Sequence, residues 1–157
     1  MSGHDHPIGD AIDWTFAAGV GARLARPGPA MSRYTADTVV AELADAADRA
    51  EAPVRDLTGL GAGHDDPLPA RVVDRTGWVH AAAGSMADLT GGNSSSWTGK
   101  PAGIQAGAML AYLSSAVLGQ YDPFSRTLLL VAPNVVAVER ALKVPTADFR
   151  LWVCLHE

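Results

Sequence analysis

The longest apolar stretch of the chain, residues 102–118, constrains the fold most. Pro101 precedes it, as proline does in the first turn of a helix, and Gly119 follows it, as glycine does at a helix end. Small residues recur every four positions on one face of this stretch: Gly103, Gly107 and Ala111. Such a face lets the backbone of another helix approach closely. We therefore expect a central buried helix with a second helix packed on this small-residue ridge.

Apolar residues at a period of about 3.6 predict five further helices. We expect them from Asp10 or Asp13 to Ala25, from Ser32 or Thr35 to Leu57, and over 78–89, 133–142 and 146–157. In the first, the expected buried face is Phe16, Val20 and Leu24. Short strands are predicted at 71–73 and at 127–131. Residues 120–124 are predicted to form a turn that leads into the second strand. The fold class is therefore mainly α: a multi-helix domain with two short β-strands, in which the terminal helix packs on residues 102–118.

Composition divides the chain into three parts. Residues 1–9 are expected to be a flexible tail, and residues 10–157 a single helical domain. Residues 90–100, rich in Gly, Ser and Thr, are expected to be a flexible insert within that domain.

Charge and hydropathy exclude several classes of function. The net charge is −5 and no run of basic residues is present, so nucleic acid is not an expected partner. The start of the chain lacks the basic and apolar regions of a signal peptide, and the longest apolar run is shorter than a membrane span. One cysteine excludes an internal disulfide and suits a reducing compartment. We expect a cytoplasmic protein without a membrane partner.

The candidate site is at the end of the chain, where His156 is followed by Glu157. Thr146 is the expected N-cap of this last helix, and Asp148 suits the positive end of its dipole. At about 100° per residue, one apolar face ends in the histidine. Its members are Phe149, Trp152, Val153 and His156. Cys154 lies on another side of the helix, so we expect a small core residue and not a metal ligand.

His-Glu opens the motif H-E-x-x-H, in which two histidines bind zinc and the Glu polarises water. The second histidine would come after two more residues, beyond Glu157. The alternative is a partly buried helix histidine followed by a solvated acid. Two other groups could bind metals: Ser2-Gly3-His4, which suits Cu(II) or Ni(II), and His64-Asp65-Asp66. A mobile tail and a solvated turn are the competing interpretations of these two segments.

Ordered motifs along nearly the whole chain resemble the zincin-like metallopeptidase type 2 family, whose members are assigned as hydrolases associated with deazaflavin-coenzyme biosynthesis. The motifs are Ile12-Asp-Trp14, Arg55-Asp-Leu-Thr-Gly-Leu60, Arg71-Val-Val-Asp-Arg-Thr-Gly-Trp-Val79, Gln105-Ala-Gly-Ala-Met-Leu-Ala-Tyr-Leu-Ser-Ser115, Val117-Leu-Gly-Gln-Tyr-Asp-Pro-Phe124, Leu128-Leu-Leu-Val-Ala-Pro-Asn-Val-Val136 and Asp148-Phe-Arg-Leu-Trp-Val-Cys-Leu-His-Glu157. The insert at 90–100 departs from the family pattern.

The resemblance implies a zinc-dependent hydrolase acting on a peptide or amide substrate. His156 would be a zinc ligand and Glu157 the general base that acts on zinc-bound water. It also implies that the chain is the zincin-like N-terminal part of such an enzyme, incomplete at its C-terminus and ending inside the H-E-x-x-H motif. With one of the three protein ligands that a catalytic zinc needs, this chain is expected to be inactive and not to bind zinc tightly.

A second hypothesis is a non-catalytic helical scaffold or partner-binding module. The apolar residues of the terminal helix would then form an association surface, covered by a second copy of the chain or by another partner. The sequence leaves this alternative open.

Overall fold

A computed structural model describes residues 11–59, 69–92 and 97–157. Within them are six α-helices, one short 3₁₀ helix and a three-stranded sheet, so the mainly α prediction is confirmed. The chain divides into two compact units, residues 1–27 with 75–116 and residues 28–74 with 117–157. The tail predicted at 1–9 lies outside the described residues, and a single domain over 10–157 stays a prediction.

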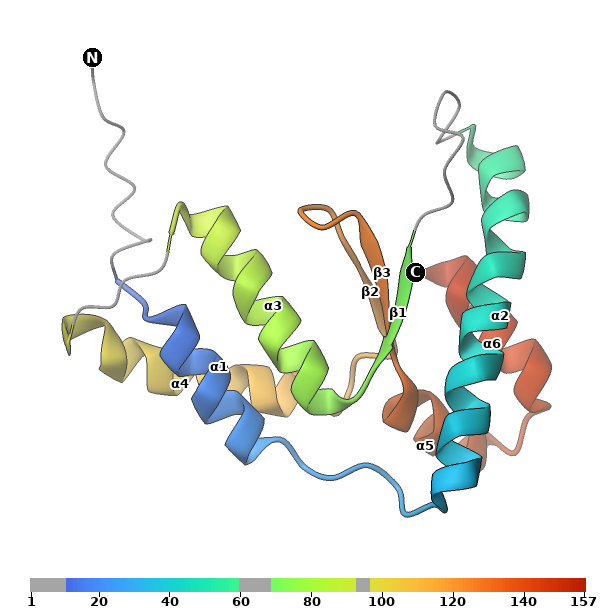
Figure 1. Cartoon of the computed structure of the whole chain (residues 1–157), viewed down its shortest axis with the longest axis horizontal. Helices are drawn as coiled ribbons and strands as arrows, with labels where there is room; N and C mark the ends of the chain where they lie inside the picture. Colours follow the sequence, from blue (N-terminus) through green and yellow to red (C-terminus); the bar gives the residue numbers. More distant parts are fainter. Residues whose placement is uncertain (1–10, 60–68, 93–96) are drawn as a thin grey trace. The chain divides into compact units, whose positions relative to one another are not determined.

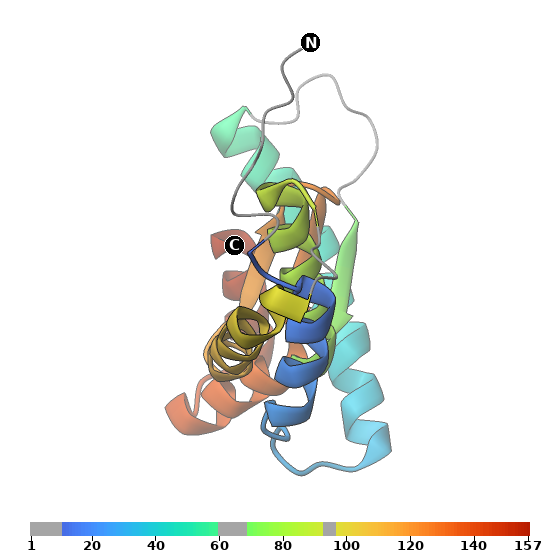
Figure 2. The ribbon, with the colours of Figure 1, turned by 90° about the vertical axis from the view of Figure 1, so that its left-hand side faces the viewer.

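The first unit contains α1 (Trp14–Leu24), α3 (Arg75–Thr90), the 3₁₀ helix η1 (Trp97–Gly99) and α4 (Lys100–Leu113). Figure 2 shows α1 and α4 side by side, and the packing between these two helices is the most extensive within the unit. Asp13 caps α1 by accepting a hydrogen bond of 2.8 Å from the Phe16 N–H. Of the predicted insert, residues 97–99 form η1 and residues 93–96 lie outside the described part, so its flexibility stays a prediction.

The small-residue ridge of α4 packs on α1, as the sequence predicts for a close helix pair. A Cβ on Gly107 would lie 2.5 Å from the Ala17 carbonyl oxygen, so no larger residue fits between the two backbones. The predicted face of α1 is wrong in part, because Leu24 is 56% exposed while Ala17 and Gly21 are buried. Close approach to α4 requires small residues on α1, and Phe16 and Val20 lie against the α4 glycines beside them.

The second unit contains α2 (Arg33–Thr58), β1 (Ala70–Val73), β2 (Gly119–Asp122), β3 (Thr127–Val131), α5 (Ala132–Leu142) and α6 (Thr146–His156). Ser32 caps α2 through the Thr35 N–H, and Gly59 ends it in the left-handed conformation at φ 66°. The described helices include none that is long and apolar enough to span a membrane.

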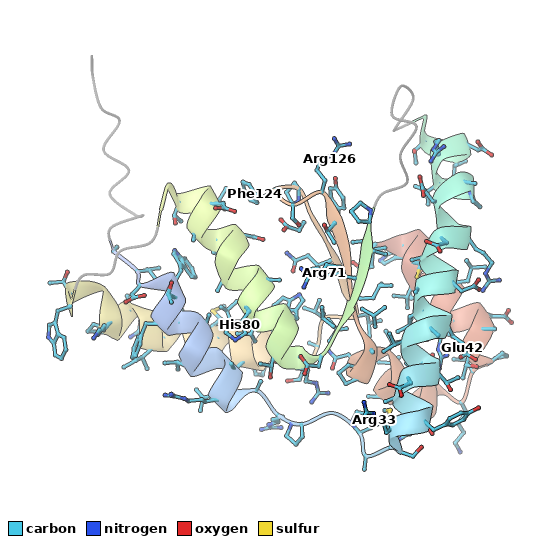
Figure 3. The ribbon with its side chains drawn as sticks, viewed as in Figure 1. Arg33, Glu42, Arg71, His80, Phe124 and Arg126 are labelled. Carbon is cyan, nitrogen blue, oxygen red and sulfur yellow. The ribbon has the colours of Figure 1, made fainter. Side chains whose placement is uncertain are left out.

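The sheet has the order β1-β3-β2, with β1 parallel and β2 antiparallel to the central strand β3 (Figure 1). Burial of Leu129, Leu130 and Val131 confirms that β3 is covered on both faces. Strand β2 corrects the predicted turn at 120–124: residues 120–122 pair with β3, and the turn follows them. Asp122 stabilises that turn by accepting hydrogen bonds from the Phe124 N–H and the Ser125 hydroxyl. The tip exposes Phe124 and carries Arg126 in the left-handed region at φ 51° (Figure 3).

The core of the second unit lies between α2, β3, α5 and α6. Its buried members are Val39, Leu43, Ala46, Ala47, Ala50, Leu130, Val135, Val136, Val153 and Cys154. Helix α6 packs on α2, whereas the sequence predicted the helix at 102–118 as its partner. That helix, α4, instead buries its glycine ridge against α1. The packing of α6 on α2 determines where the end of the chain lies within this unit.

Candidate active site

Helix α6 carries both candidate site residues. It begins after Pro145, which occupies the N-cap position without a side-chain hydrogen bond, so the prediction of Thr146 as N-cap is wrong. Asp148 lies in the first turn, as predicted, where its charge suits the helix dipole. The helix runs to His156, and Glu157 closes it by donating its backbone N–H to the Val153 carbonyl oxygen at 3.1 Å.

The buried face of α6 differs from the predicted one. Arg150, Val153 and Cys154 are buried, at the i, i+3, i+4 spacing of one helix face. Of the predicted apolar face, Val153 is buried and Phe149 half-buried, but Trp152 is 52% exposed. A charged residue, Arg150, thus takes the place predicted for Trp152, which extends toward solvent, while Phe149 packs against the core.

Arg150 fixes α6 to two other helices. Its guanidinium donates two parallel hydrogen bonds to the Glu139 carboxylate of α5, Nε to Oε1 at 2.6 Å and Nη2 to Oε2 at 3.0 Å. A third bond goes from Nη1 to Glu42, labelled on α2 in Figure 3. Paired donors facing a carboxylate in this way give both energy and a defined geometry. The hydrogen bonds to Glu139 and the negative charges of both carboxylates raise the pKa of Arg150, so it stays charged despite its burial. This network positions the end of α6, and sequence analysis missed it.

His156 is exposed and lies flat against Trp152. The two ring centroids are 5.1 Å apart and the rings are 9° from parallel. Phe149 also stacks on Trp152, and the centroids of these two rings are 5.8 Å apart. The spacing i, i+4 brings the indole and the imidazole together on one side of the helix. The stack restricts the orientation of the imidazole while leaving it accessible.

Glu157 turns its carboxyl toward strand β2. Gly119, the first residue of β2, gives it a backbone hydrogen bond. Partial burial of the carboxyl raises its pKa, while the positive charge of His156 and the Gly119 N–H oppose that rise. An accessible imidazole and a partly shielded carboxyl therefore lie side by side at the end of α6.

The family model described as zincin-like metallopeptidase matches residues 12–157, nearly the whole chain and all of α6. The chain belongs to this family. The predicted family membership is confirmed at this level.

A solved structure supports the same assignment. The chain is similar to a proposed hydrolase with a novel fold from Chloroflexus aurantiacus, at 29% sequence identity and a TM-score of 0.66. The similarity covers 93% of this chain and 50% of that protein, so the chain spans about half the length of its structural relative. A search of curated proteins found no match.

Zincin-like proteins take their name from zinc, and the residues described here do not by themselves fit a complete zinc site. Over 11–59, 69–92 and 97–157, no three His, Cys, Asp or Glu side chains converge where they could hold a metal. Of the histidines in that part of the chain, His156 ends α6, and His80 lies exposed on α3 of the other unit (Figure 3). The candidate metal groups at Ser2-Gly3-His4 and His64-Asp65-Asp66 lie outside the described residues.

The prediction that Cys154 is a small core residue is confirmed. The residue is buried in the core of the second unit, and burial raises the pKa of its thiol to about 11. A thiol must lose its proton to bind zinc, so this environment opposes metal binding at Cys154. Between Cys154 and His156, it is therefore the histidine that suits a zinc ion, with Glu157 beside it.

Proposed function

We propose that the protein is part of a zinc-dependent hydrolase of peptide or amide bonds. In this proposal His156 is a zinc ligand and Glu157 is the general base. Membership of the zincin-like metallopeptidase family supports the reaction class, and the similarity to a proposed hydrolase agrees with it. The observation that carries the assignment to residues is the pairing of an accessible imidazole with a partly shielded carboxyl at the end of α6.

The chemistry of the two side chains suits these roles. An exposed imidazole held flat against Trp152 can offer a ring nitrogen to a metal with little loss of rotational freedom on binding. A carboxyl whose pKa is raised is a better proton acceptor than an ordinary one, because catalysis favours a base whose pKa is near the working pH. Zinc, when bound, would supply an acidified water and a polarising charge.

One ligand does not make a catalytic zinc site, which takes three from protein. The chain spans half of its structural relative, and we propose that the missing ligands belong to a segment equivalent to the other half. The 157-residue chain by itself should then neither bind zinc tightly nor cleave peptides.

Two experiments test this proposal. The coding sequence after the codon for Glu157 should continue through two further codons to a histidine codon. A stop codon directly after Glu157 would contradict the catalytic assignment. Zinc titration of the 157-residue chain, with His156→Ala as control, should show only weak binding. Stoichiometric sub-micromolar binding that disappears in the His156→Ala variant would show that the site is complete without further ligands.

Exposure on α6 favours a second candidate function, a non-catalytic module that associates through this helix. Trp152 is 52% exposed and Leu155 is 41% exposed, which is high for large apolar side chains on neighbouring turns. We propose a second copy of the chain as the partner in this case. Light scattering after size exclusion should then give a dimer that Trp152→Glu converts to a monomer. A monomer at every concentration would contradict this candidate.

A further inference from the structure

Strand β2 is an edge strand of the sheet, and its first residue, Gly119, lies next to Glu157 at the end of α6. The Leu118 carbonyl oxygen accepts a hydrogen bond of 2.8 Å from the Val131 N–H, so residue 118 points its polar groups toward β3. In an antiparallel pair, the next residue points its N–H and C=O the other way. Gly119, which is opposite Leu130, therefore directs its N–H away from β3 and out from the edge of the sheet.

The side chain of Glu157 occupies the space beside this N–H. The carboxyl accepts a hydrogen bond from the Gly119 backbone. A Cβ on Gly119 would lie 2.9 Å from Glu157 Cγ, 3.3 Å from its Cδ and 3.1 Å from the Leu129 carbonyl oxygen. A real Cβ does not come as close as 2.9 Å to another heavy atom, so Glu157 Cγ would have to move, and the contacts at 3.1 and 3.3 Å would be tight.

The glycine is not needed for its backbone conformation. Positive φ angles among the described glycines occur at Gly59, Gly91 and Gly92, and Gly119 is not one of them. An alanine could adopt the backbone of residue 119 without strain. What a side chain at this position would disturb is the placement of Glu157.

We infer that Gly119 is a positioning residue for Glu157. Its missing side chain leaves room for the stem of the glutamate, and its N–H holds the carboxylate at the edge of β2, beside His156. The inference rests on the proposed function, in which Glu157 acts as the base. Arg150 fixes the helix as a whole, whereas Gly119 fixes the reactive group at its end.

Amide hydrogen exchange of the 157-residue chain tests the hydrogen bond. In Glu157→Ala, the Gly119 amide should exchange about tenfold faster, since a hydrogen bond to a charged group is lost. Asp148→Ala removes an exposed carboxylate from the other end of the same helix and should leave Gly119 exchange unchanged. Unchanged exchange in Glu157→Ala, or an equal increase in both variants, would overturn the inference.

Gly119→Ala tests the steric part. Nuclear Overhauser contacts between the Glu157 side chain and residue 119 should be lost, while those between Val153 and the core remain. Gly84→Ala is the matched control, because a Cβ on Gly84 meets nothing within 4 Å. A lowered melting temperature with the Glu157 contacts intact would show that Gly119 serves only packing, and would overturn the inference.

These readouts need neither zinc nor substrate, so they separate the inference from the proposed function. Loss of the contacts in Gly119→Ala supports positioning even if the coding sequence stops at Glu157. In that event the catalytic role of Glu157 fails on its own test. Conversely, a complete zinc motif with unaltered contacts in Gly119→Ala would leave the hydrolase assignment in place and reject Gly119 as its positioning residue.

Discussion

Replacing Arg150 by methionine should separate a buried ion pair from an exposed one within a single network. Arg150→Met keeps most of the aliphatic volume but removes the hydrogen bonds to Glu139 and Glu42. The two acids then differ sharply: the side chain of Glu139 is 5% exposed, while that of Glu42 is 56% exposed. Only Glu139 would remain as a buried charge without its partner.

The expected magnitudes follow from this difference in burial. Breaking a buried pair on one side costs about 3–5 kcal/mol of unfolding free energy. A pair with one exposed partner contributes about 0–1 kcal/mol, so Glu42→Gln should change stability little. Arg150→Met combined with Glu139→Leu leaves no buried charge, and should recover most of the loss that Arg150→Met causes alone.

Urea unfolding of chains labelled with 5-fluorotryptophan is a suitable assay, because the four tryptophans give separate fluorine signals. Trp152 lies in the second unit and Trp78 in the first. Arg150→Met should lower the unfolding midpoint reported by Trp152 far more than Glu42→Gln does. The reasoning is refuted if the two variants cost the same, or if Arg150→Met costs less than about 1 kcal/mol.

Three other predictions concern local environments. The raised pKa of Glu157 means that the folded state holds this proton more tightly, so stability is lost as the pH rises from about the ordinary value of 4.5 through the folded pKa. The free energy of unfolding of Glu157→Gln, measured in urea, should therefore increase relative to that of the parent chain as the pH rises from 4 to 7. A difference that stays constant across this range would contradict the prediction. The thiol of Cys154, with its pKa near 11, should react with iodoacetamide at pH 8 only as fast as the second unit unfolds, and rapid labelling of the folded chain would contradict its burial. Gly107→Ala should destabilise the first unit by about 1–3 kcal/mol through contact with Ala17, whereas Gly84→Ala should not, and equal melting temperatures would refute the close packing of α1 and α4.

Sequence patterns predicted the helices and the central strand well, because apolar spacing and end signals act locally. Asp13, Ser32 and Gly59 fix helix ends through neighbouring residues. Strand β2 was missed because its polar residues followed by proline favour a turn, and only pairing with β3 makes them extended. Local propensity cannot report a partner that is distant in sequence.

The buried faces were harder to predict for the same reason. A helical count of apolar residues placed Trp152 on the buried face of the last helix and gave Arg150 no role. Burial of Arg150 depends on Glu139, whose position follows from the packing of α5. The pair His156–Glu157 was identified from the sequence, and its role stays a proposal. The contact between Glu157 and Gly119 could not be seen in advance, since it requires the edge of a sheet.

The interleaving of the two units along the chain has a consequence for biosynthesis. Residues 28–74 leave the ribosome before residues 75–116, yet their partners are residues 117–157. Ala70 pairs with Leu128, and Leu43 is covered by segments of β3, α5 and α6. The apolar side of α2 must therefore stay uncovered while the nascent chain grows past the whole of α3 and α4. Closing such long loops is slow. The uncovered apolar side of α2 is therefore the surface on which aggregation of incomplete chains would begin.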